Sequence, residues 1–598
     1  MKAAKAAIFL LALSPLMVFK GAFFPFIFSK ILFIRSAIEF ALIFFLGALL
    51  FRKKEKTPFI KRSIRLFRHP VLISLGIFFV SLILSTIFAV NPYRAFWGDI
   101  ERGEGFFGLF HYLIFLFLAI FLLQETDWLR LFKISILSNF ILGPAAIFEY
   151  IKTGGRISSF LGNPSFFGTY AIFILIFSAI VFTSSKKWRL ASIVSCFLAL
   201  ITIFLSGTRG ALLGLTAGVI FLNFYYLFRQ NQTLFNINKK FQIKSRNVSI
   251  IFTILIISFF SSLWFTRETP FWQKIPGLNR VVQLFISGPQ DSSAQTRIIT
   301  WKLSLKAFQE KPFFGWGPEN FIVAYQKNYD PKYVDYGETW FDRAHNKILD
   351  ILVAQGAIGL FSYFIFFSSL FYCLFKKRLT SPTLDQAKHY IAAGLVAYFF
   401  QNLFLFDHPV SYLYFFVVQG FIITNTVEGK DKKETEKQNN YTDKNRPSVR
   451  LRTNPLIIIF SSLSIIVAVY SLYAFNITPY LQNRYWYASA KENYVPRVIE
   501  KLEKATKPYN FSQLDIIGQG IDAAYLGQYF SNPEYLENPK FKALGEYLIN
   551  LVDTFNRKEP YHVRMLLREV EMIHSFALTD DIELYQKGEI LLRKALSL

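Results

Sequence analysis

Cysteine and histidine are scarce in this chain, and neither occurs in a pattern typical of a disulfide framework or a metal site. The 598 residues include two cysteines and seven histidines. Cys196 and Cys373 both lie in apolar runs, far apart in the sequence, which excludes a small fold held together by disulfides. The histidines show no HExxH or other clustered ligand spacing, so we expect no protein-bound metal and no cofactor.

Charged residues are also few, at 18% of the chain, whereas 53% of the residues are hydrophobic and 70 are Phe. A soluble multidomain protein of this length would be less apolar. The net charge of +26 does not indicate nucleic-acid binding, because residues 476–598 carry 15 Lys and Arg against 16 Asp and Glu. The positive excess therefore lies in the apolar part, where it marks the cytoplasmic face of a membrane protein.

Long apolar runs dominate the remainder of the sequence. About thirteen stretches reach the roughly 20 residues that a membrane-spanning helix needs. They lie near residues 6–24, 29–51, 71–90, 106–123, 131–150, 168–183, 189–206, 211–228, 249–265, 346–375, 389–406, 409–426 and 455–475. We therefore predict an all-α, polytopic membrane protein. The first stretch is alternatively a signal peptide, although it has no convincing small-residue cleavage site.

Basic residues gather in alternate connectors between these stretches, at 52–69, 184–189, 229–247, 376–389 and 429–452. The positive-inside rule places these connectors, and the N-terminus with them, in the cytoplasm. The other connectors then face outward; they include residues 91–105, 152–168, 206–210 and 266–345. The part of the chain after residue 475 faces outward as well.

This pattern divides the chain into six parts. We expect transmembrane helices over 1–265, a large extracytoplasmic catalytic loop over 266–345, further transmembrane helices over 346–427, a charged cytoplasmic linker over 428–454, a last transmembrane helix over 455–475 and a small soluble helical domain over 476–598. The linker has few apolar residues, a composition typical of disorder. The last 17 residues resemble the second helix of a tetratricopeptide-type hairpin, with Gly588 and Ala595 as its small residues. The alternative is a generic helical cap.

Residues 295–361 contain a long polar segment between two apolar stretches, and we look for chemistry there. Its first part predicts a helix that Pro312 ends, with one stripe formed by Arg297, Trp301, Ser304, Leu305 and Phe308. Ser292 and Gln295 have the spacing of a capping box at its start. Arg297 would then lie within two turns of free backbone N–H groups, an arrangement that favours an anion such as phosphate.

Two further features follow this helix. Gly315-Trp316-Gly317 predicts a tight turn, because glycine pairs more often serve a turn than a phosphate cradle. His345-Asn346 stands where the next apolar stretch begins. A histidine at this interface can act as a general base, or it can simply form hydrogen bonds.

The segments RIITWKLSLKAFQEKPFFGWGPENF and AHNKILDILVAQGAIGLFSY resemble the signature region of the O-antigen ligase and O-antigen polymerase family of bacterial membrane glycosyltransferases. Further matching segments are NPYRAFWGDIERGEG, RISSFLGNPSFFGTYA, SGTRGALLG and NLFLFDH. The resemblance extends in order over about residues 5–425, and its combination of motifs is more specific than any one of them.

The resemblance implies a glycosyltransferase-C-like helical fold that works on the outer face of the cytoplasmic membrane. Members of the family transfer a glycan from a polyprenyl-diphosphate carrier to an acceptor hydroxyl, without a nucleotide sugar and, in the ligases, without a metal. Arg209 and Arg297 match arginines that hold the diphosphate, and His345 matches the base. A single displacement would invert the anomeric centre. The expected partners are the lipid-linked donor, a lipid, glycan or protein acceptor and membrane lipids, but no nucleic acid.

Five more residues are candidates for substrate binding. Arg156, Arg280 and Arg343 are possible second phosphate contacts, Trp316 offers a face for a sugar, and Asn346 neighbours the base. Each candidate has a structural alternative. The arginines, Arg209 among them, can extend to lipid headgroups or loops, Arg297 can be a solvated helix residue, and Asn346 can cap the next helix.

We predict a glycosyltransferase in which ligation to a lipid core is the first choice, polymerisation of repeat units the second and transfer to protein the third. The segment after residue 475 departs from the simplest ligases, which end soon after their last span, and is a candidate for acceptor or partner binding. A transporter of lipid-linked glycan is the alternative from another class. It would need ionisable residues in the middle of spans and internal repeats of spans, and the sequence shows neither clearly.

Overall fold

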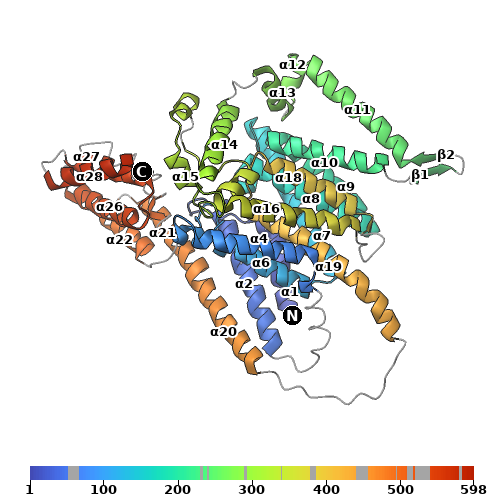
Figure 1. The fold of residues 1–598 in the computed structure, drawn as a ribbon, viewed down its shortest axis with the longest axis horizontal. Coiled ribbons are helices and arrows are strands. Elements are labelled where there is room, and N and C mark those ends of the chain that lie inside the picture. Colours follow the sequence, from blue (N-terminus) through green and yellow to red (C-terminus); the bar gives the residue numbers. More distant parts are fainter. Residues whose placement is uncertain are drawn as a thin grey trace.

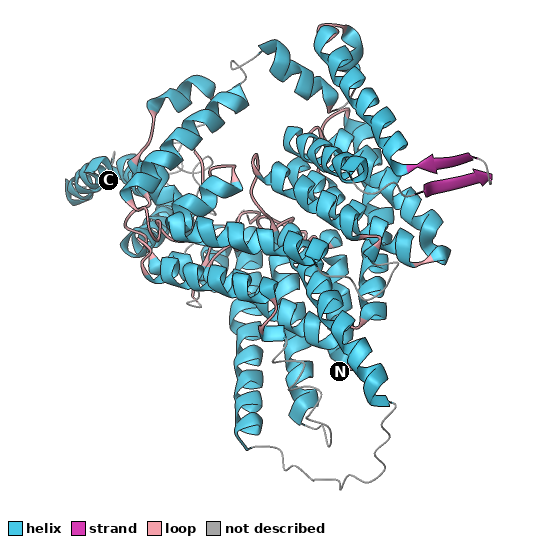
Figure 2. Ribbon diagram, turned by 45° about the vertical axis from the view of Figure 1, so that its right-hand side comes forward, coloured by secondary structure: helices cyan, strands magenta, loops and turns pink. Residues whose placement is uncertain are grey.

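The computed structural model describes residues 1–50, 66–228, 233–238, 241–275, 277–287, 292–337, 340–376, 385–439, 455–492, 494–507, 513, 516–518, 539–577 and 582–597. It is built almost entirely of helices (Figure 1). Those of the apolar part are α1 (Lys2–Leu10), α2 (Phe28–Leu50), α4 (Pro70–Ile87), α6 (Phe106–Leu122), α7 (Glu125–Thr153), α8 (Pro164–Ser184), α9 (Arg189–Ser206), α10 (Arg209–Phe228), α11 (Ser245–Phe265), α16 (Lys347–Lys376), α18 (Lys388–Asn402), α19 (Pro409–Asn439) and α20 (Pro455–Leu472). Strands β1 (Thr233–Asn238) and β2 (Phe241–Lys244) form an antiparallel hairpin between α10 and α11 (Figure 2).

The apolar helices pack into one bundle with a continuous core. Helix α8 lies inside it, with nearly every side chain from Phe166 to Val181 buried, as expected for a helix that is hydrophobic on all sides. Neighbouring pairs are α8 with α9, α10 with α18, α4 with α16 and α6 with α19. Helix α11 lies against α10, and α20 against α2, both at the edge of the bundle (Figure 1).

The predicted all-α, polytopic membrane architecture is confirmed. In the described part of the chain, nine helices are long and apolar enough to cross a membrane, compared with about thirteen predicted stretches. Three of the predicted stretches, 106–123, 389–406 and 409–426, form the helices α6, α18 and α19 of the same bundle but are not among the nine.

The predicted span over residues 6–24 is wrong. The chain there forms the short helix α1, then the 3-10 turn Leu11–Leu16, and then irregular backbone up to α2. Pro15 lies inside that turn. Because proline lacks an N–H and clashes with the preceding turn, it does not allow a continuous α-helix.

The predicted loop over residues 266–345 is largely helical and contributes to two separate cores, one formed by Trp272 and Val282 with Leu263 and the other by residues between Ile299 and Val353. It contains α12 (Pro270–Lys274), α13 (Leu278–Ser287), α14 (Ser292–Glu310), α15 (Phe321–Lys327) and the 3-10 helix Pro331–Tyr336. Helix α14 ends before Pro312, as the sequence predicts. Residues 288–291, which precede Ser292, lie outside the described residues, so the predicted capping box at Ser292 stays a prediction. Its buried face differs from the predicted stripe, because Ile299, Leu303 and Ala307 face the core whereas Leu305 is 49% exposed.

A kink in α16 joins the unit of α14 and α15 to the bundle. Gly356 has φ +66° and ψ −166°, so the helix is interrupted there. The backbone N–H groups of Trp316 and Gly317 donate to the carbonyl oxygens of Val353 and Ala354 at 2.8 and 2.9 Å. The turn predicted at Gly315-Trp316-Gly317 therefore exists, and it satisfies carbonyl groups that the kink leaves without helical partners.

The C-terminal part is helical as predicted, with α21 (Thr478–Ser489), α22 (Val495–Thr506), α26 (Pro539–Lys558), α27 (Val563–Ala577) and α28 (Ile582–Ser597). It lies beside the unit of α14 and α15 (Figure 1). Asn91 donates to Glu559 at 2.7 Å, and the rings of Trp340 and His562 lie 5.9 Å apart. The tetratricopeptide assignment stays a prediction.

The predicted charged linker over 428–454 begins as helix. Helix α19 continues as far as Asn439, which differs from the disorder that the composition of this segment predicts. Residues 440–454 of the predicted linker lie outside the described residues.

Candidate active site

Four arginines from separate segments lie together near the start of α10. Arg209 is the first residue of α10, and it follows Gly207, which ends α9 in the left-handed conformation. Its Nε donates to the carbonyl oxygen of Arg280 at 2.9 Å. Arg280 donates in turn to the carbonyl oxygen of Gly207 at 3.3 Å. Arg156 donates from Nε to the carbonyl oxygen of Ser206 at 2.8 Å. The short turn between α9 and α10 thus brings three of the predicted arginines together.

Arg297 on α14 is the fourth member of this arginine cluster (Arg156, Arg209, Arg280 and Arg297). The pKa of Arg156 is lowered to about 10, first by burial and then by the positive charges of Arg280, Arg209 and Arg297. Like charges raise one another's electrostatic energy. A gathering of this kind is characteristic of a site that receives an anion.

His345 lies beside the arginine cluster, in the loop between α14–α15 and α16. Its φ of +53° is unusual for a residue other than glycine. The neighbouring Ala344 is held on both sides, because its N–H donates to Asp350 at 2.6 Å and its carbonyl oxygen accepts from Trp301 Nε1 at 3.0 Å. The imidazole ring packs edge-on against the ring of Phe406 at 5.1 Å. The loop therefore fixes the direction of the histidine ring.

The electrostatic surroundings keep His345 neutral at physiological pH. Its pKa is lowered to about 4, first by burial and then by the charge of Arg297. Its Nδ1 lies 3.3 Å from the carbonyl oxygen of Arg343. Since a carbonyl oxygen only accepts, Nδ1 carries the proton in this contact and Nε2 retains the lone pair.

Two of the predicted binding residues have partners within the protein. Asn346 caps α16, because its Oδ1 accepts from the N–H groups of Ile348 and Leu349 at 3.0 and 3.3 Å. Arg343 is 5% exposed, and its guanidinium donates to Glu319 at 2.7 Å and lies 3.5 Å from Glu104. The expected phosphate contact of Arg343 is thus replaced by two carboxylates, which hold it because a buried charge needs a partner.

Trp316 also differs from its prediction. Its side chain is 3% exposed and its Nε1 donates to the carbonyl oxygen of Ala307 at 2.9 Å. The indole belongs to the core of the α14–α15 unit, so its face is not presented to a sugar. The apolar area of tryptophan favours burial once its N–H has a partner.

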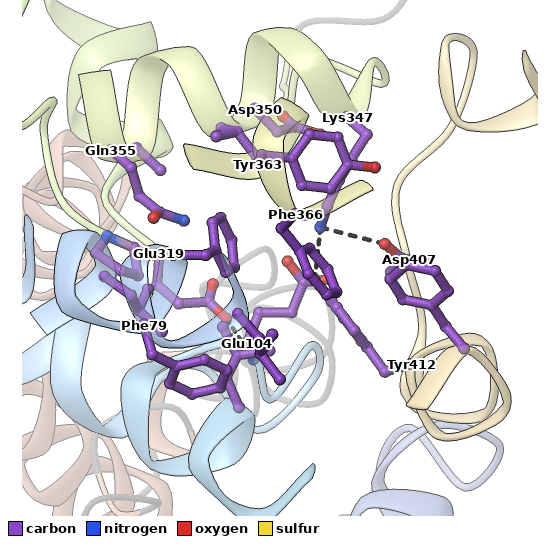
Figure 3. A pocket seen from close by; sticks show the side chains of 18 of the residues that line it. Phe79, Glu104, Glu319, Lys347, Asp350, Gln355, Tyr363, Phe366, Asp407 and Tyr412 are labelled. Atoms are coloured by element: carbon purple, nitrogen blue, oxygen red, sulfur yellow. Dashed lines mark hydrogen bonds and ion pairs between the residues drawn. The ribbon is translucent and has the colours of Figure 1, made fainter. Parts of the chain in front are cut away.

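Sequence reasoning gave little weight to a set of charged residues next to His345. Lys347 Nζ lies 3.3 Å from Asp407 and donates to the hydroxyl of Tyr412 at 2.6 Å. With Glu104, Glu319 and Asp350, these residues line a cavity of about 90 Å³ (Figure 3). The signal that could have found them is the occurrence of Lys347 and Asp350 in the first turn of an otherwise apolar span, since ionisable residues in spans are costly and usually functional.

The described residues contain no group of three or more His, Cys, Asp or Glu side chains placed to hold a metal ion. Asp342, beside Arg343, is instead paired with Arg102 at 2.7 Å. Burial would raise the pKa of this carboxyl, but Arg102 and Arg343 outweigh burial and hold it well below its usual range. This ion pair links the loop after α5 (Pro92–Trp97) to the His345 loop.

Comparison with known proteins identifies the part of the chain that carries this site. Residues 194–364 match the family model described as O-antigen ligase. An uncharacterized protein of Haemophilus influenzae is 27% identical over 266 residues, a match that covers 43% of this chain and 60% of that protein. The chain therefore spans less than two thirds of the length of this relative. Arg209, Arg280, Arg297 and His345 all lie inside the family match. Residues 194–364 of this chain are thus similar to the O-antigen ligase family, which supports the resemblance that the sequence motifs indicate.

Proposed function

We propose that this protein is a bacterial cytoplasmic-membrane glycosyltransferase that moves a glycan from a polyprenyl-diphosphate carrier to an acceptor hydroxyl on the outer face. The observation that carries the proposal is the arginine cluster next to a neutral histidine. Arg297 is common to both, since its charge lowers the pKa of Arg156 and of His345. A donor diphosphate on the arginines would therefore lie within reach of His345.

The diphosphate is the leaving group of the proposed reaction. When the bond between the anomeric carbon and the diphosphate oxygen breaks, the bonding electrons remain on that oxygen and its negative charge grows. Guanidinium groups of the arginine cluster stabilise this charge through forked N–H donors. The side chains come from α10, α13, α14 and the loop before α8, so their positions are fixed by several elements.

His345 is the proposed base. Its Nε2 accepts the proton of the acceptor hydroxyl while the hydroxyl oxygen forms a bond to the anomeric carbon. Attack opposite to the leaving diphosphate inverts the configuration at that carbon. The left-handed backbone of His345 and the contacts of Ala344 preserve the direction of the ring, which the in-line geometry requires.

Contacts between the predicted outward segments support a site on one side of the membrane. The side-chain amide of Asn91 donates to Glu559 in the C-terminal part, and its oxygen accepts from the backbone N–H of Arg94. The backbone N–H of Asn91 donates to the side chain of Asn320 at 3.1 Å. Lys347 pairs with Asp407, and Arg156 contacts the α9–α10 turn. Segments that parity places outside thus contact one another, as a site on one side of the membrane requires.

The test is transfer by the purified protein, with a polyprenyl-diphosphate glycan as donor and lipid, glycan and peptide acceptors. We expect His345→Ala and Arg297→Gln to lower the rate by at least about 100-fold. Lys306→Gln, an exposed residue on the same helix as Arg297, is the matched control and should retain full activity. The accepted substrate distinguishes ligase, polymerase and protein transferase. Full activity in His345→Ala would contradict the role of the base, and movement of the donor across vesicles without transfer would favour the transporter.

A further inference from the structure

The cavity beside His345 has a lining of two kinds. Charged and hydroxyl side chains form one part, where Glu104, Glu319, Lys347 and Asp407 point toward one another (Figure 3). Aromatic and aliphatic side chains form the other, among them Phe79 and Phe366. A purely structural ion-pair network would be packed tightly, because protein interiors seldom leave such voids.

Three buried polar atoms on the cavity-lining residues have no hydrogen-bond partner among the residues that the structure describes. They are Glu104 Oε1, Arg343 Nε and Asp350 Oδ2. Arg343 is more than nine-tenths buried. Leaving a buried polar atom without a partner is costly, so such atoms indicate a ligand or ordered water. Here two acceptors and one donor are left, and the missing partner must both donate and accept.

The charge of the lining decides among ligand classes. Four carboxylates, from Glu104, Glu319, Asp350 and Asp407, face two cationic side chains, so an anionic phosphate is disfavoured. A bare cation would leave the Arg343 N–H without an acceptor. A neutral sugar satisfies both requirements, because each hydroxyl donates and accepts, and its apolar face suits the ring of Tyr412 or Phe79.

The cavity also has a defined relation to the base. Arg343 and Lys347 line the cavity and each lies two residues from His345. Asp407 lines it as well, and the adjacent Phe406 touches the imidazole ring. We propose that this cavity is a subsite for a neutral sugar residue of the acceptor, held by Glu104, Asp350 and Arg343. The acceptor role rests on the proposed function; the binding of a neutral sugar does not.

The first test is binding to the full-length protein in nanodiscs, free of glycoside detergent, by saturation-transfer NMR. The probes are methyl β-D-glucoside, methyl β-D-galactoside and methyl α-D-mannoside, with methyl β-D-glucuronide as an anionic comparison. We expect a neutral glycoside to bind and the glucuronide to bind more weakly. Glu104→Leu should weaken binding about 10-fold or more, since it removes a charged acceptor. Glu101→Leu, in the same loop but not in the cavity lining, should leave binding unchanged.

A second variant serves if Glu104→Leu does not fold. Leu109→Trp fills the cavity from α6 and should abolish glycoside binding while the thermal unfolding midpoint stays near that of the wild type. No binding of any neutral glycoside would overturn the proposal and leave ordered water as the content of the cavity. Equal binding in wild type, Glu104→Leu and Leu109→Trp would also overturn it, because the sugar would then lie elsewhere.

A transfer assay separates this proposal from the proposed function. Glu104→Leu should raise the acceptor KM about 10-fold or more and leave the donor KM unchanged. If Glu104→Leu transfers the glycan with an unaltered acceptor KM, the acceptor subsite is contradicted, whereas the proposed transferase activity is not. Glycoside binding in the cavity by a protein that transfers nothing would support the sugar site and contradict the transferase.

Discussion

At the scale of single residues, the site depends on how His345 is held. A residue other than glycine in the left-handed region costs free energy, which neighbouring contacts must offset. Asp350 and Trp301 supply those contacts through the backbone of Ala344. The histidine itself could be predicted from the AHN motif, but its backbone conformation depends on side chains that are not adjacent in sequence.

We predict that the transfer rate falls at low pH, in the acid limb of its pH profile, because His345 becomes protonated there. Its pKa of about 4 means that the ring is neutral, and able to accept a proton, at any pH well above 4. The maximal rate should therefore change little between pH 7 and pH 5 through this group, and fall as the pH drops through about 4. The measurement is a pH profile of kcat at saturating substrates.

Arg297→Gln provides a check on the cause of this shift. The charge of Arg297 lowers the pKa of His345, so its removal should move the acid limb of kcat to higher pH. Lys306→Gln on the same helix should leave the limb in place. An acid limb near the ordinary histidine pKa of about 6.5 in the wild type would contradict the assignment of His345 as the base.

Asp350 is predicted to act through the position of His345. Asp350→Ala leaves the N–H of Ala344 without its acceptor, a loss of about 1–3 kcal/mol at a buried group. We expect kcat to fall at least about 10-fold. Asp350→Asn keeps an oxygen for this N–H and should retain most of the rate, measured at saturating acceptor. If Asn and Ala were equally impaired, the charge of Asp350 and not the hydrogen bond would be responsible.

At the scale of elements, the kink in α16 is what brings the α14–α15 unit to the membrane bundle. The turn containing Gly315 and Gly317 fits into it, and a Cβ on Gly315 would lie 2.4 Å from the carbonyl oxygen of Val353. Such closeness explains why this motif contains glycine. The sequence predicts the turn, but it does not reveal that the turn and the kink pair with each other, because the two are about 40 residues apart.

Gly356→Ala should therefore destabilise the protein. The residue has a φ of +66°, and a Cβ would lie 2.3 Å from the carbonyl oxygen of Phe313. We expect a loss of at least about 2 kcal/mol, measured as a lower thermal unfolding midpoint in detergent. Gly47→Ala in α2, where a Cβ meets nothing within 4 Å, is the matched control. It should be neutral or stabilising by up to about 1 kcal/mol. Equal midpoints for both variants would contradict the role of the kink.

At the scale of the whole molecule, the C-terminal helices and the last apolar helix are tied to the remainder of the chain by specific polar contacts. Ser471 and Asn476 donate to Glu39 of α2, the latter at 2.7 Å. Arg564 lies over the ring of Trp340, five residues before His345. The C-terminal domain thus borders the segment that leads to the proposed base, which is consistent with a role in acceptor or partner binding.

The predicted topology can be tested by cysteine labelling. In a variant without Cys196 and Cys373, we expect Lys332→Cys and Lys504→Cys to react with a membrane-impermeant maleimide in intact spheroplasts. Lys187→Cys should react only after permeabilisation, since basic connectors stay in the cytoplasm. All three side chains are exposed. Labelling of Lys187→Cys in intact cells would place the arginine cluster on the cytoplasmic side and contradict the proposed donor.

The sequence by itself determined the class of this protein, because a bilayer requires long apolar helices and these are visible as continuous runs. The resemblance over residues 194–364 and the end of α14 before Pro312 were also predictable, because they depend on residues close together in the chain. Only the tertiary structure decided which charges meet. Trp316 was predicted to contact a sugar, yet its indole N–H donates to the carbonyl group of Ala307. Arg343 was predicted to contact a phosphate, yet it is paired with Glu319 and Glu104. The broken first stretch was missed as well, since mean apolarity hides the effect of Pro15. The cavity beside His345 is likewise formed by segments hundreds of residues apart, and packing alone brings such groups together.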